Sequence, residues 1–305
     1  MKSIIIGLGV QGKKRLKAIK IKNEIFATVD PVNNNADYRY LKDVPINRYD
    51  TAIISVHNQA KLSIIEYSIR NKKNIMVEKP FLIKSEKDYK KIKKTIIKNK
   101  IVFYTAYNHR FEPHLVEIKK ILKKKIIGKI YYTKFFYGNG TAKLVRKNKF
   151  KDSGNGIIDD LGSHIIDLCL FFYGNKIKNF TYILKKKFEN KSNDYSFFVH
   201  KDKKFHIEAQ LSYCMWKNNF ICDIIGSKGS IHLNGLCKWG PSELIIRKRK
   251  LFFDFAFISS PSGLHYSQAK FFLSRNSNVL IEKPFVLNLR DTKDLIKISD
   301  KTKKK

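Results

Sequence analysis

The chain has 305 residues, of which 43% are hydrophobic, and 62 Lys and Arg against 26 Asp and Glu give a formal net charge of +36. This length and apolar content are enough for a sizeable core and predict about two domains. No apolar run approaches the ~18 residues that cross a bilayer, which argues against a membrane-spanning protein. The four cysteines show no CxxC spacing, so we expect no structural metal.

The basic residues are spread over every segment and do not gather with aromatic residues in one stripe. The charge therefore predicts solvated faces in preference to a nucleic-acid site. The opening residues, MKSIIIGLGVQGKKR, imitate a secretory signal, but the apolar part is short and Lys13, Lys14 and Arg15 follow it directly. We reject export on this pattern and expect a cytoplasmic protein with reduced thiols.

Residues 2–20, KSIIIGLGVQGKKRLKAIK, predict a buried strand, a glycine turn and a basic helix. In the GxGxxG pattern, Gly7 makes the turn, Gly9 lets the backbone approach a pyrophosphate, and Gly12 lets the helix pack on the strand. The free N–H groups at the start of the helix attract an anion. The pattern predicts a dinucleotide site, whose contacts also include Val10 and Gln11.

The next apolar strand, EIFATVD, ends in Asp30, which lies 18 residues beyond Gly12 (30 − 12 = 18). A carboxylate there can accept a hydrogen bond from a ribose 2′-OH and would repel a 2′-phosphate. This favours NAD over NADP as the cofactor. The alternative interpretation is an aspartate that only forms the turn at the end of a strand.

Strands and helices alternate from residue 50 to about residue 110, which predicts a parallel doubly wound sheet. Ser85 with Asp88 three residues later predicts the start of one of the helices. Ligands of such sheets lie at the carboxyl ends of the strands. The candidate residues at those ends are Ser55, Asn58, Glu78, Lys79, Asn108 and Arg110.

Residues 154–174, GNGIIDDLGSHIIDLCLFFYG, predict a glycine loop followed by a helix. Asp160 and His164 are four residues apart and are expected on one helix face, with Gly162 between them leaving space for a ligand. Asp167 falls on a neighbouring part of that face. A carboxylate beside an imidazole is typical of a base with an orienting partner. The alternative is an ordinary aspartate at a helix start and a partly buried histidine.

Between residues 111 and 250 the sequence also contains alternating, β-branched and aromatic segments, broken by Gly, Asn and Asp. They predict a large, mostly antiparallel open sheet with one covered face. We therefore expect an α/β fold in which a Rossmann sheet is followed by an α+β domain.

The glycine turn, Glu78-Lys79-Pro80, YNHRF and D-x-G-x-H occur in this order, and together they resemble the glucose–fructose oxidoreductase / inositol dehydrogenase / MocA (Gfo/Idh/MocA) family over residues 1 to about 250. The resemblance implies NAD(P)-dependent hydride transfer to or from a hydroxyl of a sugar, cyclitol or sugar nucleotide. It also implies that Lys79, beside a cis peptide before Pro80, contacts substrate and nicotinamide, and that Asp160 and His164 are the family's D-x-x-x-H pair.

On this basis His164 is expected to accept the hydroxyl proton, with Asp160 orienting it and Lys79 stabilising the alkoxide. Which of Lys79 and His164 finally takes the proton stays open. The expected cofactor contacts are Gly7, Gly9, Val10, Gln11, Gly12, Asp30, Ser55, Asn58, Glu78 and Lys79. The expected substrate contacts are Lys79, Asn108, Arg110, Asp160 and His164.

Residues 50–81 (the first copy) and 254–285 (the second copy) align without gaps at an offset of 204, with 10 of 32 positions identical. The second copy has no glycine turn, although its SSPSGLH is closer to the family's usual pattern than SVHNQAK of the first copy. The sequence predicts a cofactor domain at 1–110, a substrate domain at 111–250 that is incomplete at its end, and a partial duplicate at 251–305.

Three accounts of the duplicate stay open. It is a gene-fusion remnant in a compromised enzyme, a tail that docks on the first domain, or a tail that exchanges with a partner chain. The expected partner is a small sugar-like molecule, and a homo-oligomer through the open sheet is one alternative. A non-catalytic NAD- or sugar-binding regulator is the rival function, and a nucleic-acid binder has only charge in its favour.

Overall fold

The computed structural model describes residues 1–20, 24–83, 85–174, 177–202, 205–249 and 253–305. The chain divides into two compact units, Met1–Ile246 and Arg247–Lys305. The predicted boundary between residues 250 and 251 lies outside the described residues, so the three-part division stays a prediction.

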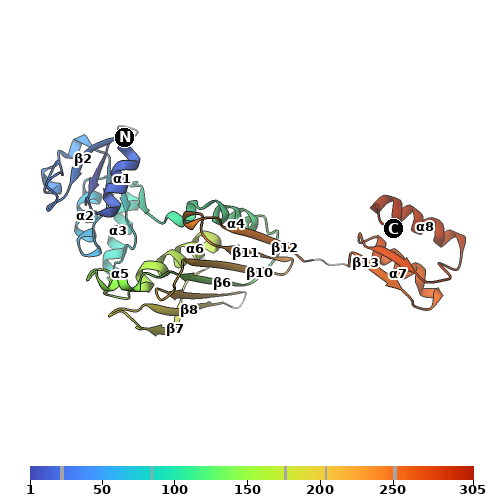
Figure 1. The fold of residues 1–305 in the computed structure, drawn as a ribbon. Coiled ribbons are helices and arrows are strands. Elements are labelled where there is room, and N and C mark those ends of the chain that lie inside the picture. Colours follow the sequence, from blue (N-terminus) through green and yellow to red (C-terminus); the bar gives the residue numbers. More distant parts are fainter. Residues whose placement is uncertain (21–23, 84, 175–176, 203–204, 250–252) are drawn as a thin grey trace. The chain divides into compact units, whose positions relative to one another are not determined.

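A five-stranded sheet (sheet A) opens the first unit, with strands in the order β2-β1-β3-β4-β5 and every pair parallel (Figure 1). Most of its strand residues are buried, because helices cover both faces, and this explains the near-continuous apolar runs in the sequence. The prediction of a parallel doubly wound sheet is confirmed. The strands are β1(Ser3–Ile6), β2(Ile25–Val29), β3(Thr51–Ile54), β4(Asn74–Val77) and β5(Phe103–Thr105).

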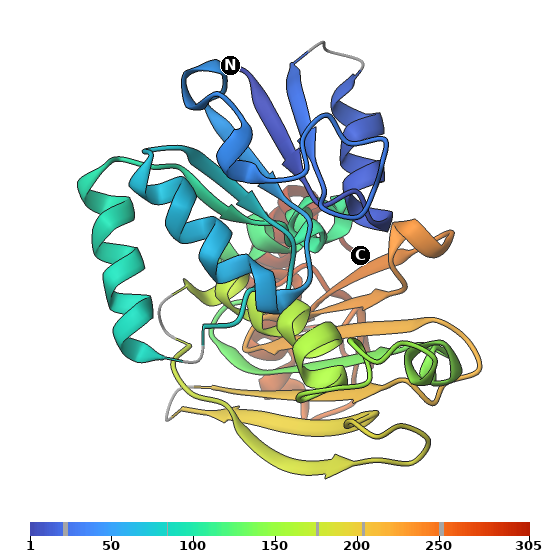
Figure 2. The ribbon, with the colours of Figure 1, turned by 90° about the vertical axis from the view of Figure 1, so that its left-hand side faces the viewer.

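The helices of sheet A divide between its two faces. On one face α1(Val10–Lys20) packs through Leu16 and Ile19 against a cluster that includes Ile53 of β3. On the other face lie α2(Asn58–Arg70) and α3(Glu86–Lys98), which contact each other and lie side by side in Figure 2. The predicted start of α3 is confirmed, since Ser85 Oγ accepts a hydrogen bond from the Asp88 N–H at 3.3 Å. Two short 3-10 turns, Leu41–Asp43 and Ile46–Arg48, precede β3.

A seven-stranded sheet (sheet B) follows, with the order β12-β11-β10-β6-β9-β8-β7. Strands β6 and β9 are parallel, whereas β10–β11, β10–β6, β7–β8 and β8–β9 are antiparallel, so the predicted mostly antiparallel sheet is confirmed. Its strands are β6(Ile130–Gly138), β7(Thr181–Lys186), β8(Tyr195–Lys201), β9(His206–Ser212), β10(Asn219–Gly226), β11(Gly229–Asn234) and β12(Glu243–Lys248).

One face of sheet B is buried, as the alternating burial along β9 and β10 shows. The core on that face joins the sheet to α4(Pro113–Lys123) and α6(Ser163–Tyr173). The 3-10 turn η3(Asn108–Phe111), the helix α5(Ala142–Arg146), the π-helical turn η4(Ile158–Gly162) and the 3-10 turn η6(Cys237–Trp239) connect these elements. Sheet B thus carries connecting turns that bring polar side chains towards sheet A.

The second unit contains a two-stranded parallel sheet of β13(Phe255–Ile258) and β14(Asn278–Ile281). The 3-10 turn η7(Ser262–Leu264) and α7(His265–Leu273) connect the strands, and α8(Leu289–Thr302) follows. These elements enclose a small core of their own, formed by Ile258, Ala269, Leu273 and Leu295. Among the residues that the structure describes, no helix has the length and apolar character needed to span a membrane.

Candidate active site

The glycine turn between β1 and α1 has the tight geometry that the sequence predicts. Gly7 has a φ of +90°, and a Cβ on Gly12 would lie 1.8 Å from the Gly7 carbonyl oxygen, so a side chain cannot be accommodated at position 12. A Cβ on Gly9, in contrast, would meet nothing within 4 Å. Gly12 therefore serves the packing of the turn, and Gly9 borders open space that a phosphate could fill.

Asp30, directly after β2, holds the glycine turn. Its carboxylate accepts hydrogen bonds from the N–H groups of Leu8 at 2.7 Å, Val32 at 2.9 Å and Asn33 at 2.9 Å. Burial raises its pKa, but these three hydrogen bonds outweigh burial and the pKa is lowered. A carboxylate has about four acceptor positions, so one stays open for a ribose hydroxyl. The turn-forming interpretation of Asp30 and the ligand-binding one are thus compatible.

Two more predicted cofactor residues border the same end of sheet A. Ser55 follows β3 and Asn58 begins α2, and Ser55 Oγ and Asn58 Oδ1 are buried without a hydrogen-bond partner among the described residues. Such groups are costly unless a ligand or water satisfies them. Together with the open space at Gly9 they fit a bound dinucleotide. Val10 and Gln11 are exposed at the start of α1.

Lys79 and Asp160 meet between the two sheets. Lys79 follows β4 beside a cis peptide to Pro80, as expected, and its ammonium donates a short hydrogen bond to Asp160 Oδ1 in the turn η4. Tyr213, after β9, donates to Asp160 Oδ2 at 2.9 Å. Burial raises the pKa of Asp160, but the Lys79 ammonium and the hydrogen bond from Tyr213 lower it by more. The pKa of Asp160 is therefore below its ordinary value. The Lys79–Asp160 ion pair therefore connects the end of a strand of sheet A to the turn η4.

The predicted pairing of Asp160 with His164 is wrong. The Asp160 oxygens bond to Lys79 and Tyr213, and His164 Nδ1 is buried without a hydrogen-bond partner in the described part of the chain. The physical reason is the turn η4, which is π-helical and not α-helical. Its wider turn removes the alignment that residues four apart have in an α-helix.

His164 instead stacks on a second histidine. The rings of His164 and His109 lie 4.1 Å apart at 23°, with Tyr107 edge-on to His164 at 5.7 Å. Burial, Lys238 and Lys79 lower the pKa of His109 to about 3, and burial, His109 and Lys79 lower that of His164 as well. Both imidazoles are therefore uncharged at neutral pH, which is the form that can accept a proton.

Two predicted contact residues bond to protein partners. Arg110 makes a bidentate pair with Asp167, at 2.7 Å from Nε and 2.6 Å from Nη2, and Glu78 accepts from Arg15 Nε at 2.7 Å. The observed contacts of Arg110 and Glu78 hold α6 and α1, and their ligand contacts stay predictions. Asn108 Oδ1 lies 3.1 Å from His109 Nδ1, beside the stacked rings.

Sequence reasoning missed Tyr213 and Lys238, and it placed His109 at a strand end without giving it a role. His109 lies inside the YNHRF motif, so the motif itself was a usable signal, whereas neither Tyr213 nor Lys238 lies in a motif. Lys238, in η6, donates to Tyr137 Oη at 3.3 Å, and its pKa is lowered by burial and by Lys79, although Glu112 raises it. The site thus holds a second ammonium, which comes from a turn more than 150 residues away from Lys79 (238 − 79 = 159).

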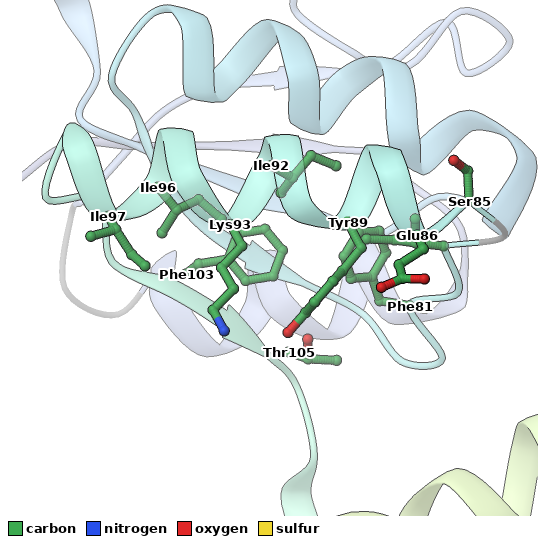
Figure 3. Close-up of a pocket in the computed structure, with 11 residues that line it drawn as sticks. Phe81, Ser85, Glu86, Tyr89, Ile92, Lys93, Ile96, Ile97, Phe103 and Thr105 are labelled. Atoms are coloured by element: carbon green, nitrogen blue, oxygen red, sulfur yellow. The ribbon is translucent and has the colours of Figure 1, made fainter.

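A cavity of about 730 Å³ lies between α3 and β5, with Tyr89, Ile92 and Phe103 in its wall (Figure 3). Its lining is mainly apolar and includes none of the predicted site residues. It is therefore distinct from the Lys79–Asp160 site.

Comparison with known proteins places the chain among oxidoreductases. The model for the GFO/IDH/MocA C-terminal domain matches residues 115–232, and the model for the oxidoreductase family with an NAD-binding Rossmann fold matches residues 242–305. The second match falls on the partial duplicate.

Curated relatives match over limited parts of their length. A scyllo-inositol 2-dehydrogenase (NADP(+)) of Bacillus subtilis is 43% identical over 44 residues, which are 14% of this chain and 13% of that protein. A D-apiose dehydrogenase of Rhizobium rhizogenes is 24% identical over 127 residues, which are 42% of this chain and 36% of the relative. The matches thus span well under two thirds of either relative.

Among solved structures, a putative NADPH-dependent oxidoreductase from Desulfitobacterium hafniense has the same fold, with a TM-score of 0.72 at 18% identity over 82% of this chain and 80% of that chain. The two family-model matches, the ordered motifs and this fold agree with one another. Over residues 115–232 and 242–305 the chain thus matches the Gfo/Idh/MocA family of oxidoreductases.

Proposed function

We propose that this chain is an NAD(P)-dependent dehydrogenase that transfers a hydride between a nicotinamide cofactor and a hydroxyl-bearing carbon of a sugar, cyclitol or sugar nucleotide. The carrying observation is the Lys79–Asp160 pair at the carboxyl end of β4, whose ammonium is close enough to the stacked His109 and His164 to lower the pKa of both. A ligand at the end of sheet A would meet an ammonium and a neutral imidazole together.

The side chains of the site support a division of the proton chemistry. When bound, the nicotinamide takes the hydride that leaves the carbinol carbon. The hydroxyl proton leaves to a base, for which His164 is the first candidate by residue type, although its lowered pKa makes the ring a weak base before ligands bind. The Lys79 ammonium stabilises the negative charge on the oxygen, while Asp160 holds Lys79 and itself accepts a hydrogen bond from Tyr213. Lys79 is the alternative acceptor, for which it would have to enter the reaction as the uncharged amine.

NAD is the proposed cofactor in preference to NADP. The support is the Asp30 carboxylate beside the glycine turn, whose charge would repel a 2′-phosphate. The Bacillus subtilis relative is named for NADP(+), so the proposed preference for NAD is argued from Asp30 of this chain and not from that relative. Replacing Asp30 with Ser is expected to weaken NAD binding and narrow the difference between NAD and NADP, as fluorescence titration of both cofactors would measure.

Polyhydroxylated substrates are the proposed class. The curated relatives are named for scyllo-inositol and D-apiose, a cyclitol and a sugar. In this chain the ammonium groups of Lys79 and Lys238 offer hydrogen-bond donors to neighbouring hydroxyls. The face of sheet B that the core leaves open is proposed as the surface of a homo-oligomer.

The decisive experiment measures NADH and NADPH formation by the purified chain with cyclitols, aldoses and nucleotide-linked sugars. We expect turnover with at least one of them. Cofactor binding without turnover of any substrate would support the rival function, a non-catalytic NAD- or sugar-binding regulator. No binding of either cofactor would refute the dehydrogenase and the NAD-binding regulator, and only a sugar-binding regulator would then be left.

The glycine turn supplies a control for cofactor binding. Gly9→Ala adds a methyl group to open space, so the melting temperature should stay within about 1–2 °C of wild type. If the pyrophosphate lies there, the methyl group should weaken NAD binding about tenfold or more. Unchanged NAD binding in this variant would move the cofactor away from the glycine turn.

A further inference from the structure

A lysine lies beneath the turn that carries Lys79. Lys61, in α2, is only 2% exposed, and its ammonium donates hydrogen bonds to the carbonyl oxygens of Glu78 at 2.6 Å and Pro80 at 2.5 Å. These two carbonyls belong to the residues on either side of Lys79. A buried ammonium is costly unless it is hydrogen-bonded, so two such bonds fix the turn firmly.

Burial and the neighbouring charges set the protonation state of Lys61. Burial lowers its pKa to about 8; the Glu78 carboxylate acts in the opposite direction and Lys79 in the same direction. The Glu78 side chain is itself paired with Arg15 of α1 at 2.6 Å. At neutral pH Lys61 therefore carries its proton and can donate to both carbonyls.

In the second copy a histidine stands at the position equivalent to Lys61. The equivalent position is 61 + 204 = 265, and His265 is 1% exposed. Its Nδ1 bonds to the Pro284 carbonyl at 2.8 Å and its Nε2 to the Ser260 carbonyl at 2.6 Å. In both copies the residue at this position holds the carbonyl of the proline in Glu-Lys-Pro.

We propose that Lys61 is a positioning residue for Lys79: by holding the carbonyls before and after Lys79, it directs the Lys79 side chain towards Asp160. Its catalytic consequence rests on the function proposed above, whereas the positioning itself does not. The duplicate further implies that a histidine at position 61 can hold one of these two carbonyls, that of Pro80, because His265 bonds to the equivalent Pro284 carbonyl and directs its other nitrogen to Ser260.

The first test uses hydrogen exchange, which needs no substrate. Lys61→Met removes both hydrogen bonds while keeping an apolar stem of similar length. We expect faster exchange in a peptide covering residues 78–83, whose Glu78 N–H normally donates to the Ile54 carbonyl at 2.9 Å. Lys61→His, which can keep the hydrogen bond to the Pro80 carbonyl, should exchange more slowly there than Lys61→Met. Lys73→Met is the matched control, since Lys73 also donates to a backbone carbonyl, that of Tyr49 at 2.6 Å, before β4 and away from the turn.

The second test measures turnover with a substrate found in the panel. Lys61→Met should lower kcat about 10- to 100-fold with little change in the KM for NAD, because Lys79 is misplaced by a fraction of an ångström or more. Lys61→His should recover kcat to within a few fold, and Lys73→Met should leave it unchanged.

The outcomes separate the two proposals. If no substrate is turned over, the proposed function fails and the exchange measurement still decides the positioning role. Wild-type exchange at residues 78–83 in Lys61→Met would overturn that role. A Lys61→His variant that exchanges as fast there as Lys61→Met would overturn the inference that a histidine can hold this turn.

Discussion

The first and second copies begin from related sequences and adopt the same local structure. In the first copy β3 pairs with β4 so that Thr51 faces Asn74 and Ile54 faces Val77. In the second, β13 pairs with β14 so that Phe255 faces Asn278 and Ile258 faces Ile281, which is the same register after the offset of 204. Both copies have a cis peptide before the proline. The shared sequence therefore specifies strand, helix, turn and register.

The two copies differ in what covers them. Ile53 of the first copy is 4% exposed, because α1 packs on that face of sheet A. The equivalent Phe257 is 60% exposed and its neighbour Phe255 is 54% exposed. Of the described strands, only β14 pairs with β13, whereas β3 lies between β1 and β4. Burial is thus a property of the neighbours that each copy has.

The copies also differ in chemistry. Lys79 meets Asp160, which lies outside the repeat, whereas Lys283 is exposed and has no ion-pair partner within the described ranges. The same Glu-Lys-Pro-Phe letters thus form a candidate site in one copy and a surface turn in the other. The lysine of this motif therefore gains an ion-pair partner only where a residue from outside the repeat reaches it.

The largest expected effect tests that conclusion directly. Lys79→Met should reduce turnover about 10²-fold or more while NAD binding is largely kept, because the ammonium is lost and Asp160 loses its partner. Lys283→Met should leave turnover at the wild-type level. Initial rates with the two variants measure this, and an equal loss in both would mean that the second copy takes part in catalysis.

A smaller effect is expected on stability. Ile53→Ala removes buried methyl groups beneath α1 and should cost about 2–5 kcal/mol of unfolding free energy. Phe257→Ala removes an exposed ring and should stay within about 0.5 kcal/mol of wild type. Denaturant unfolding, followed by hydrogen exchange of the peptides containing β3 and β13, separates the two units. A large loss from Phe257→Ala would indicate that the exposed face is covered in solution.

Acid should affect the glycine turn, which the second copy lacks. The pKa of Asp30 is lowered in the folded chain, so its ionised form adds stability above the unfolded pKa of about 3.9, and this stability is lost as pH falls through the folded pKa. The melting temperature of wild type should exceed that of Asp30→Asn at pH 7, and the difference should shrink below about pH 4. A difference that does not vary with pH would contradict this account.

The smallest effects concern the helix that follows each copy. Ser85 Oγ caps α3 at 3.3 Å, and Asn288 Oδ1 caps α8 through the Asp291 N–H at 2.9 Å. Ser85→Ala and Asn288→Ala should each cost about 1 kcal/mol, with the larger loss at Asn288 because its hydrogen bond is shorter. Thermal unfolding checks both values. A loss at only one of the two would show that this local feature, too, depends on its surroundings.

Local sequence signals accounted for much of the fold. The glycine turn, the parallel strands of sheet A, the alternating strands of sheet B and the repeat all follow from short-range patterns of side-chain size, polarity and backbone freedom. The candidate site was only partly predictable. Lys79 and Asp160 were both identified, but their contact with each other was not, because nothing local connects residues 81 positions apart.

The sequence by itself determined which segments form strands and helices, and it marked a glycine turn, Lys79 and His164 as candidates for the chemistry, since propensity and motif spacing act over a few residues. Tertiary structure alone decided the partners. Asp160, which lies in the π-helical turn, pairs with Lys79 and not with His164. His109 stacks on His164, and Arg110 pairs with Asp167. The reason is that ion pairs, ring stacking and burial depend on which distant segments meet. The packing of sheets A and B decides which segments those are.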